Sequence, residues 1–98
     1  IAAAGGSASL PSVSAAISEL PTIGVPVETK KLFGIDSILS MASCPKGAPL
    51  ATMPIGKAGA VNAALLAAEI ISTFDDKTRF NLSKWKRKQT KSVKIKPK

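Results

Sequence analysis

The sequence predicts an α/β fold in which helices cover a parallel sheet. Between Gly24 and Ala68, two short apolar segments are each followed by a loop of small residues and then by an Ala- or Ser-rich segment with helical spacing. This alternation of strand, loop and helix is typical of parallel sheets. Ligands of such folds bind in the loops that follow the strands, so those loops are the expected place of a functional site.

The length and composition indicate one small domain. The chain has 98 residues, 45% of them hydrophobic, so it can bury only a modest core. Its one cysteine, Cys44, excludes an internal disulfide and suits a reducing compartment, which favours a cytoplasmic location. The longest apolar stretch, 58–71, is interrupted by polar residues and is shorter than the roughly 20 residues that cross a bilayer, so no membrane partner is expected.

The first predicted elements are a strand and a helix that flank a glycine pair. Ile1–Ala4 is expected to be the end of an apolar strand, directly before the glycines at 5–6. Ser9 is expected to cap the following helix, and Pro11 fits its first turn. Apolar residues then recur at helical spacing, at Val13, Ala16, Ile17 and Leu20.

The second strand and helix follow in the same order. Thr22–Val27 is the predicted strand, and Pro26 lies near its end, where the missing N–H is least harmful. Gly34 precedes the next helix, which ends at segment 44–47 because Pro and Gly do not propagate a helix. The predicted apolar face of this helix consists of Ile35, Ile38, Leu39 and Ala42.

The third strand leads into two further helices. Leu50–Ile55 is the predicted strand. Gly56–Gly59 is expected to be a flexible loop that allows close helix packing, because it lacks the spacing of a phosphate-binding Walker loop. A helix is predicted over Ala60–Thr73, and the acids at 75–76 are expected to cap a fourth helix that extends to Gln89.

The charge distribution divides the chain into two predicted parts. Residues 1–76 contain four lysines and six acids, a net charge of −2, whereas residues 77–98 contain ten Lys or Arg and no acid. The formal charge of +8 therefore comes entirely from the end of the chain. We expect an α/β part over 1–74 and a basic helix with a frayed tail over 75–98. Apolar residues that would dock this helix are Phe74, Leu82 and Trp85.

The residue types that most often carry catalysis are sparse. The sequence has no histidine, the side chain best suited to proton exchange near neutral pH. No Ser, Lys or Cys has an identifiable base partner, and one cysteine without histidine cannot form an ordinary zinc site. We therefore expect no metal site and no catalysis by this segment alone. Asp36 fits the role of a first-turn helix acid, and Cys44 that of a half-buried packing residue.

The glycine turn within 3–11 is the best candidate site. It joins the first strand to the first helix, where glycines let a ligand approach the backbone and the amides at the helix start favour an anionic group. The same pattern also fits a tight turn that needs only small residues. The sequence leaves both interpretations open.

Five segments in uninterrupted register over residues 1–73 carry a family resemblance. They are Ala4–Pro11, Gly24–Val27, Gly34–Ser40, Pro45–Pro49 and Asn62–Ala68. They resemble the second half of the PurE family, the carboxyaminoimidazole ribonucleotide mutases of purine biosynthesis and the related aminoimidazole ribonucleotide carboxylases.

The resemblance implies a flavodoxin-like three-layer sandwich whose N-terminal strands are missing from this chain, and a homo-octamer. It implies an isomerase that moves a carboxylate from the ring-attached nitrogen to the ring carbon without metal or organic cofactor. A carboxylase, which is a lyase, is the related activity, and Gly56–Gly59 favours the mutase. The implied substrate-binding residues are Ala4, Gly5, Gly6, Ser9, Leu10 and Pro11, and loops 31–34 and 44–47 match family loops near the site.

Three departures from the family pattern qualify the resemblance. Ser9 stands where the family has His, and a hydroxyl cannot hold a proton near pH 7. The family's Leu-Ser-Gly is 32–34 here, with Phe33, and its Gln-Met-Pro is 43–45. The N-terminal Ser-x-Ser-Asp and Ser-Ala-His-Arg segments have no counterpart, so no catalytic residue is assigned in this chain. We therefore expect the chain alone to be inactive. We also expect it to be poorly soluble, because strand 1–4 would expose an unpaired edge.

A different function class remains open. A non-catalytic remnant could act as a structural subunit, or bind RNA or another polyanion through Lys77 to Lys98, whose ten cations would make binding strongly dependent on salt. Trp85 could stack on a base, although docking of the helix is the commoner role. A basic, solvated helix also often binds nothing.

Overall fold

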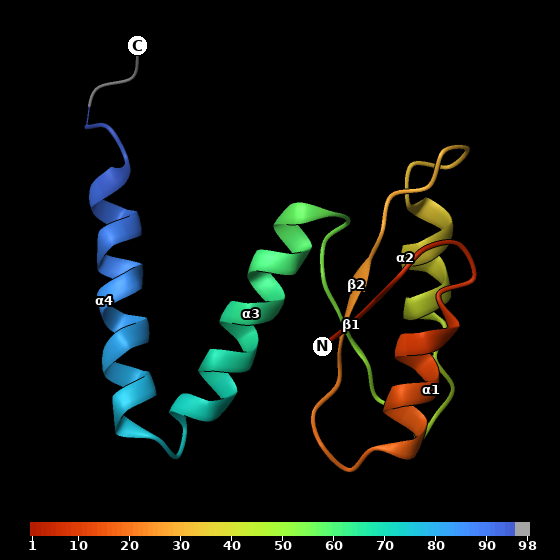
Figure 1. Ribbon diagram of the computed structural model, residues 1–98, viewed down its shortest axis with the longest axis horizontal. Helices are drawn as coiled ribbons and strands as arrows, with labels where there is room; N and C mark the ends of the chain where they lie inside the picture. Colours follow the sequence, from red (N-terminus) through yellow and green to blue (C-terminus); the bar gives the residue numbers. More distant parts are fainter. Residues whose placement is uncertain (96–98) are drawn as a thin grey trace. The chain divides into compact units, whose positions relative to one another are not determined.

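The structure, a computed structural model, describes residues 1–95. The elements follow the predicted order of strand and helix (Figure 1). The last three residues of the predicted tail lie outside the described residues. The elements are β1 (Ala2–Ala4), α1 (Ser9–Ile17), β2 (Ile23–Pro26), α2 (Ile35–Ala42), β3 (Ala51–Thr52), α3 (Lys57–Ser72) and α4 (Asp76–Ser92).

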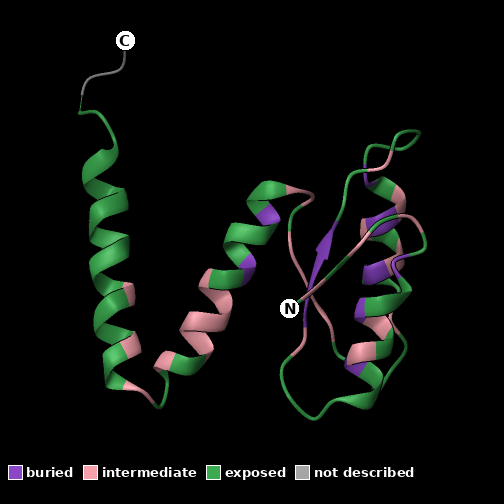
Figure 2. Cartoon of the chain, in the orientation of Figure 1, coloured by how far each residue is buried: buried purple, intermediate pink, exposed green. Residues whose placement is uncertain are grey.

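The three strands form one parallel sheet in the order β1-β2-β3. Ala2 pairs with Gly24 and Ala4 with Pro26, while Ile23 pairs with Ala51. All four residues of the central strand β2 are buried, as Figure 2 shows in purple. The prediction of a parallel α/β fold is therefore confirmed, and β1 is an edge strand within the described chain.

Helices cover both faces of β2. A Cβ placed on Gly24 would lie 3.1 Å from Met41 Sδ of α2, and one placed on Gly59 of α3 would lie 3.4 Å from Val25 Cγ1. Successive strand residues point to opposite faces of a sheet, so α2 and the start of α3 cover opposite faces. This three-layer order is consistent with the predicted flavodoxin-like fragment.

The chain divides into two compact units, Ile1–Ala64 and Leu65–Lys98, and the division falls within α3. The predicted boundary between 74 and 75 rests on the change in charge and stays a prediction. The sheet, α1, α2 and the first turns of α3 belong to the first unit.

The prediction that Gly56–Gly59 is a flexible loop is wrong for most of its length, because α3 begins at Lys57. Gly56 has a φ of 79° and makes the turn alone. Gly59 is helical, and a Cβ there would lie 1.7 Å from the Pro54 carbonyl oxygen. The close packing expected of this segment is thus present, and Gly59 provides it.

The start and the buried face of α1 differ from the prediction. Ser9 is the first helical residue rather than the cap, and Ala8 precedes it with a φ of 47°. The Ala8 N–H donates to the Gly5 carbonyl at 3.2 Å, which closes a turn directly before the helix. Pro11 and Ala15 are the buried residues of this helix. The predicted apolar side chains Val13 and Ile17 are exposed, and Leu20 lies beyond the helix end.

The buried face of α2 also differs from the prediction. The buried residues are Ser37 and Met41, whereas the side chains of Ile35 and Leu39 are 53% and 61% exposed. The predicted face is therefore wrong. A serine is tolerated inside because its hydroxyl is hydrogen-bonded, and α2 packs with that polar position against the neighbouring loops.

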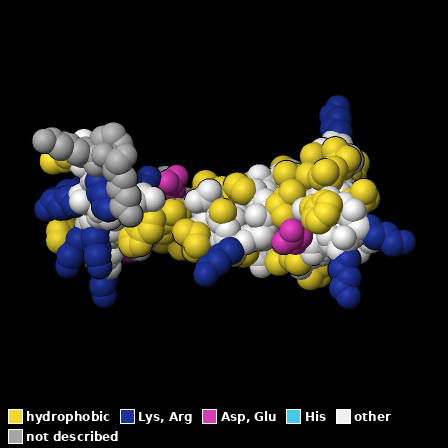
Figure 3. All heavy atoms as spheres, turned by 90° about the horizontal axis from the view of Figure 1, so that it is seen from above, with side chains coloured by type: hydrophobic (Ala, Val, Ile, Leu, Met, Phe, Trp, Pro, Cys, Tyr) yellow, Lys and Arg dark blue, Asp and Glu magenta, His cyan; other side chains and the backbone are white. Residues whose placement is uncertain are grey.

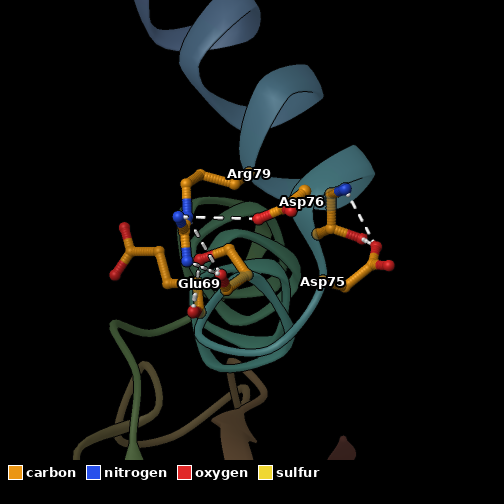
Figure 4. A network of polar contacts seen from close by, with 6 residues as sticks. Glu69, Asp75, Asp76 and Arg79 are labelled. Atoms are coloured by element: carbon orange, nitrogen blue, oxygen red, sulfur yellow. Dashed lines mark hydrogen bonds and ion pairs between the residues drawn. The ribbon is translucent and has the colours of Figure 1, made fainter.

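In the second unit, Asp75 caps α4, as predicted. Its carboxylate accepts hydrogen bonds from the Thr78 hydroxyl and, at 2.9 Å, from the Thr78 N–H (Figure 4). These bonds hold the pKa of Asp75 below its ordinary value. Arg79 donates to the Ser72 carbonyl at 3.0 Å and lies 3.6 Å from Asp76. The helix α4 extends three residues beyond its predicted end.

None of the helices described over 1–95 has both the length and the apolar character that membrane crossing requires.

Candidate functional site

The glycine turn lies at the carboxyl end of β1. The strand ends at Ala4, Gly5 is exposed, and Gly6 has a φ of 62°, in the left-handed region that favours glycine. Because β1 and β2 are parallel, their carboxyl ends lie at the same edge of the sheet. The predicted connection of strand, glycine turn and helix is therefore present at the edge where such folds bind ligands.

Gly5 and Gly6 are glycines for different reasons. At Gly6 the positive φ alone accounts for the residue type. At Gly5 the φ lies outside the left-handed region, and a Cβ would make only ordinary contacts, 3.5 Å to Thr29 Cγ2 and 3.7 Å to the Val27 carbonyl oxygen. Packing therefore does not require glycine at position 5. A turn that needs only small residues would therefore also accept alanine at position 5.

The loop that follows β2 lies against this turn. The Val27 N–H donates to the Ala4 carbonyl at 2.9 Å, which extends the ladder between the two strands. Further along the loop, the Thr29 hydroxyl donates to Asp36 at 2.8 Å and accepts from the Gly34 N–H at 3.3 Å. Asp36 lies in the first turn of α2, as predicted. The loop is thus fixed at both ends, beside the turn.

Two residues of this loop have left-handed backbones. Gly34 has a φ of 95°, and a Cβ there would lie 2.6 Å from Ile55 Cγ2, so glycine is required. Phe33 has a φ of 55°, a backbone angle that is uncommon for an aromatic residue. Its side chain is exposed. This strained position is the one at which the sequence departs from the family's Leu-Ser-Gly. It is held in place between the bonds of Thr29 and the packing of Gly34.

Two serines of α2 contact the glycine turn. Ser37 is fully buried; its hydroxyl accepts a hydrogen bond from the Gly6 N–H at 2.9 Å and donates to the Val27 carbonyl at 2.9 Å. The Ser40 hydroxyl donates to the Ser7 carbonyl. No sequence pattern predicted a role for these two serines. Their signal was a pair of hydroxyls three residues apart in a helix whose only other polar side chain is that of Asp36.

The predicted site residues occupy one continuous segment. Ala4 is half-buried in β1, and Ser9 and Leu10 are exposed in the first turn of α1. Pro11, in the same turn of the helix, is buried. The ligand contacts of the predicted set, which also includes Gly5 and Gly6, stay predictions.

The structure places the two loops expected near the site at different ends of α2. Loop 31–34 precedes the helix, and its Gly34 N–H donates to Thr29, whose Cγ2 would lie 3.5 Å from a Cβ at Gly5. Loop 44–47 follows the helix, and the thiol of Cys44 donates to the Ser12 hydroxyl of α1 at 3.3 Å. Cys44 is half-buried, as predicted. Within this chain, therefore, only the first of the two loops borders the turn.

Comparison with known proteins adds independent observations. The family model described as AIR carboxylase matches residues 1–92. The N5-carboxyaminoimidazole ribonucleotide mutase of Brucella melitensis is 50% identical over 97 residues, which are 99% of this chain and 60% of that protein. The mutase of Bacillus subtilis is 60% identical over 76 residues, which are 78% of this chain and 47% of that protein. The mutase of Escherichia coli is 48% identical over 93 residues, which are 95% of this chain and 55% of that protein. The chain thus spans about half the length of these curated relatives.

Proposed function

The chain belongs to the AIR carboxylase family, and on that premise we propose that it is the C-terminal part of a carboxyaminoimidazole ribonucleotide mutase of purine biosynthesis. The reaction would move a carboxylate from the ring-attached nitrogen of the nucleotide to its ring carbon. This segment would contribute part of the substrate site. The related carboxylase activity, that of a lyase, is the second possibility within the family.

The geometry of Gly5 carries the proposal. It is an exposed glycine at the carboxyl edge of a parallel sheet, and neither its backbone angle nor its packing requires glycine. A bound nucleotide that lies against the backbone accounts for the missing side chain. The left-handed Gly6 turns the chain from this glycine toward the start of α1, and the amides at a helix start suit an anionic group.

The division of chemical work follows from the side chains. Ser9 is exposed at the helix start and can donate or accept a hydrogen bond, but it cannot store a proton near neutral pH. The 98 residues contain no histidine. We therefore assign binding and orientation of the nucleotide to this segment and proton transfer to residues outside it.

A homo-oligomer, an octamer in its complete form, is part of the proposal, as is a cytoplasmic location. Figure 3 shows hydrophobic side chains, in yellow, at the surface. In α1 the exposed apolar residues Leu10, Val13 and Ile17 recur at intervals of three and four, which places them along one side of the helix. Such a stripe on a helix is typical of a surface that another subunit covers.

A titration tests the proposed binding role. The purified chain is titrated with aminoimidazole ribonucleotide in a calorimeter, beside a Gly5→Val variant and an Ala16→Val variant whose exposed position lies on α1. We expect saturable binding by the parent and by Ala16→Val, and binding that is weaker by about tenfold or more for Gly5→Val, because the side chain would occupy the space of the ligand. Equal binding by Gly5→Val would contradict the proposal, as would no binding by the parent at millimolar nucleotide.

The charge of α4 supports a second candidate function, polyanion binding. Its exposed cations include Lys84, Lys88 and Lys91, which follow one side of the helix. Phe80 and Trp85 lie beside them, and these residues, with Asn81 and Arg87, line one shallow depression. Cations with interleaved aromatic rings suit single-stranded RNA. Because all these residues come from a single helix, the depression has no enclosing wall, which makes this the weaker candidate.

A further inference from the structure

The polar contacts of α2 are concentrated on the turn that leads into α1. Ser37 and Ser40 are three residues apart, so their side chains lie on one side of the helix. The first is bonded to the Gly6 N–H and the second to the Ser7 carbonyl. Two successive residues of the turn are therefore held from the same helix.

Ser37 makes a bond that few side chains can replace. One oxygen accepts from the Gly6 N–H and donates to the Val27 carbonyl, both at 2.9 Å, and the residue has no exposed surface. A hydroxyl is the smallest group that is donor and acceptor at once. Alanine at this position would leave the Gly6 N–H and the Val27 carbonyl, whose bonds to Ser37 are part-buried, without this partner. The two backbone groups belong to the segments that follow β1 and β2, so the hydroxyl joins the ends of two strands.

The bond also determines which backbone groups remain for a ligand. The Gly6 N–H donates to Ser37 and is therefore not available to a ligand. The same bond holds the left-handed backbone of Gly6 in place. Gly5, one residue earlier, remains exposed. A turn whose second glycine is anchored presents the first glycine in one orientation.

We propose that Ser37, supported by Ser40, is a positioning residue that fixes the glycine turn in its ligand-binding shape and couples it to the end of β2. The identity of the ligand, a phosphorylated imidazole nucleotide, rests on the proposed function. The hydrogen bonds of Ser37 do not depend on it. Ser37 does not touch the nucleotide in this scheme. Its effect passes through the Gly6 N–H and the Val27 carbonyl.

The test measures the turn and the ligand separately. Hydrogen exchange of the Gly6 amide in the isotope-labelled chain reports on the bond, and calorimetric titration with aminoimidazole ribonucleotide reports on binding. For Ser37→Ala we expect exchange at Gly6 to be faster by about tenfold and nucleotide binding to be weaker by about tenfold, because the amide loses its partner. Ser37→Thr, which keeps the hydroxyl, should restore both values. The matched control is Ser18→Ala, which removes a hydroxyl that accepts from the Leu20 N–H at 3.1 Å outside the site.

A second variant keeps the test decisive if Ser37→Ala does not fold. Ser40 is only half-buried, and Ser40→Ala should weaken nucleotide binding by about threefold while the chain stays folded. Unchanged Gly6 exchange and unchanged binding in the folded serine variants would overturn the positioning role and leave the proposed function intact. If the parent binds no nucleotide, the proposed function fails, and the exchange at Gly6 alone decides whether Ser37 holds the turn.

Discussion

The hydroxyl of Ser37 accepts a hydrogen bond from the Gly6 N–H at 2.9 Å, although 31 residues separate the two in the sequence. The bond brings the middle of α2 to the turn between β1 and α1. It explains why α2 buries a serine while two of its aliphatic side chains remain exposed. The orientation of α2 is thus set by a polar contact as well as by apolar packing.

The two glycines of the turn should respond differently to substitution. Gly6→Ala should lower the free energy of unfolding by about 1 kcal/mol, since alanine is strained at a φ of 62°. Gly5→Ala should leave stability within about 0.5 kcal/mol, because its Cβ meets only ordinary contacts. Urea unfolding of the two variants and the parent measures this difference. Equal losses at both positions would show that Gly5 is also structural.

The packing of α3 on the loop after β3 predicts a large effect at Gly59. Gly59→Ala should destabilise the first unit by about 3 kcal/mol or prevent its folding, because the new methyl group would lie 1.7 Å from the Pro54 oxygen. Ala60→Ser, at an exposed position of the same helix, is the control and should cost less than about 1 kcal/mol. Thermal unfolding followed by circular dichroism distinguishes them. A Gly59→Ala variant as stable as the control would contradict the observed packing.

The cap of α4 predicts a dependence of its stability on pH. The pKa of Asp75 is lowered by the Thr78 hydroxyl and then by the Thr78 N–H, so the contribution of the carboxylate is complete above its ordinary pKa of 3.8. It should be lost as the pH falls from 3.8 through the lower pKa of the folded state. Helicity measured by circular dichroism between pH 6 and pH 2 reports this loss.

The control for this prediction is Asp75→Asn, which also caps helices but does not titrate. It should remove the contribution of this residue to the pH dependence while keeping α4 helical at pH 6. If the parent and the Asn variant lose helicity in parallel, other groups are responsible for the effect of acid.

The chain alone should not turn over carboxyaminoimidazole ribonucleotide. It contains no histidine, and it spans about half the length of its relatives. An assay of the purified chain, with and without the part of the Bacillus subtilis mutase that it does not match, measures the effect. We expect activity only in the mixture. Turnover by the chain alone would mean that proton transfer takes place within these 98 residues.

The second candidate function predicts binding of RNA that weakens steeply with salt. Titration of an unstructured RNA at 50 and 200 mM salt should show a fall in affinity of about 10³-fold if six phosphates are contacted. Replacing Lys84, Lys88 and Lys91 with Gln is the matched variant, since these cations lie on one side of α4. No binding at 50 mM salt would exclude this candidate.

The order of strands and helices was predictable because turn residues mark each junction. Gly5, Gly34 and Gly56 each lie where a strand or loop gives way to a helix, and the acid at Asp75 marks the start of α4. Each of these junctions is set by the residue type at the junction itself, so it can be predicted from a short stretch of sequence. Segment 57–59 was wrongly predicted as a loop, because glycine usually interrupts a helix, whereas Gly59 lies inside α3 and allows close packing against Pro54.

The buried faces and the contacts of the site were not predictable in the same way. Hydrophobic periodicity pointed to Ile35 and Leu39, but the helix turns Ser37 inward because partners for its hydroxyl lie on other segments. These partners lie 31 and 10 residues away in the sequence and leave no periodic pattern in the helix. The glycine turn itself was predictable, whereas the different roles of Gly5 and Gly6 required backbone angles and distances.

The composition of β1 has a consequence for how the sheet aligns. Its three residues are all alanine, so after a slide of one step along β2 two of the three paired positions would still carry a methyl group. Side-chain shape therefore contributes little to selecting the correct alignment. That selection is left to directional bonds at the end of the strand, where the Val27 N–H meets the Ala4 carbonyl and the Ser37 hydroxyl meets the Gly6 N–H. Without them, slippage by one step would carry the glycines away from the edge at which a ligand could reach them.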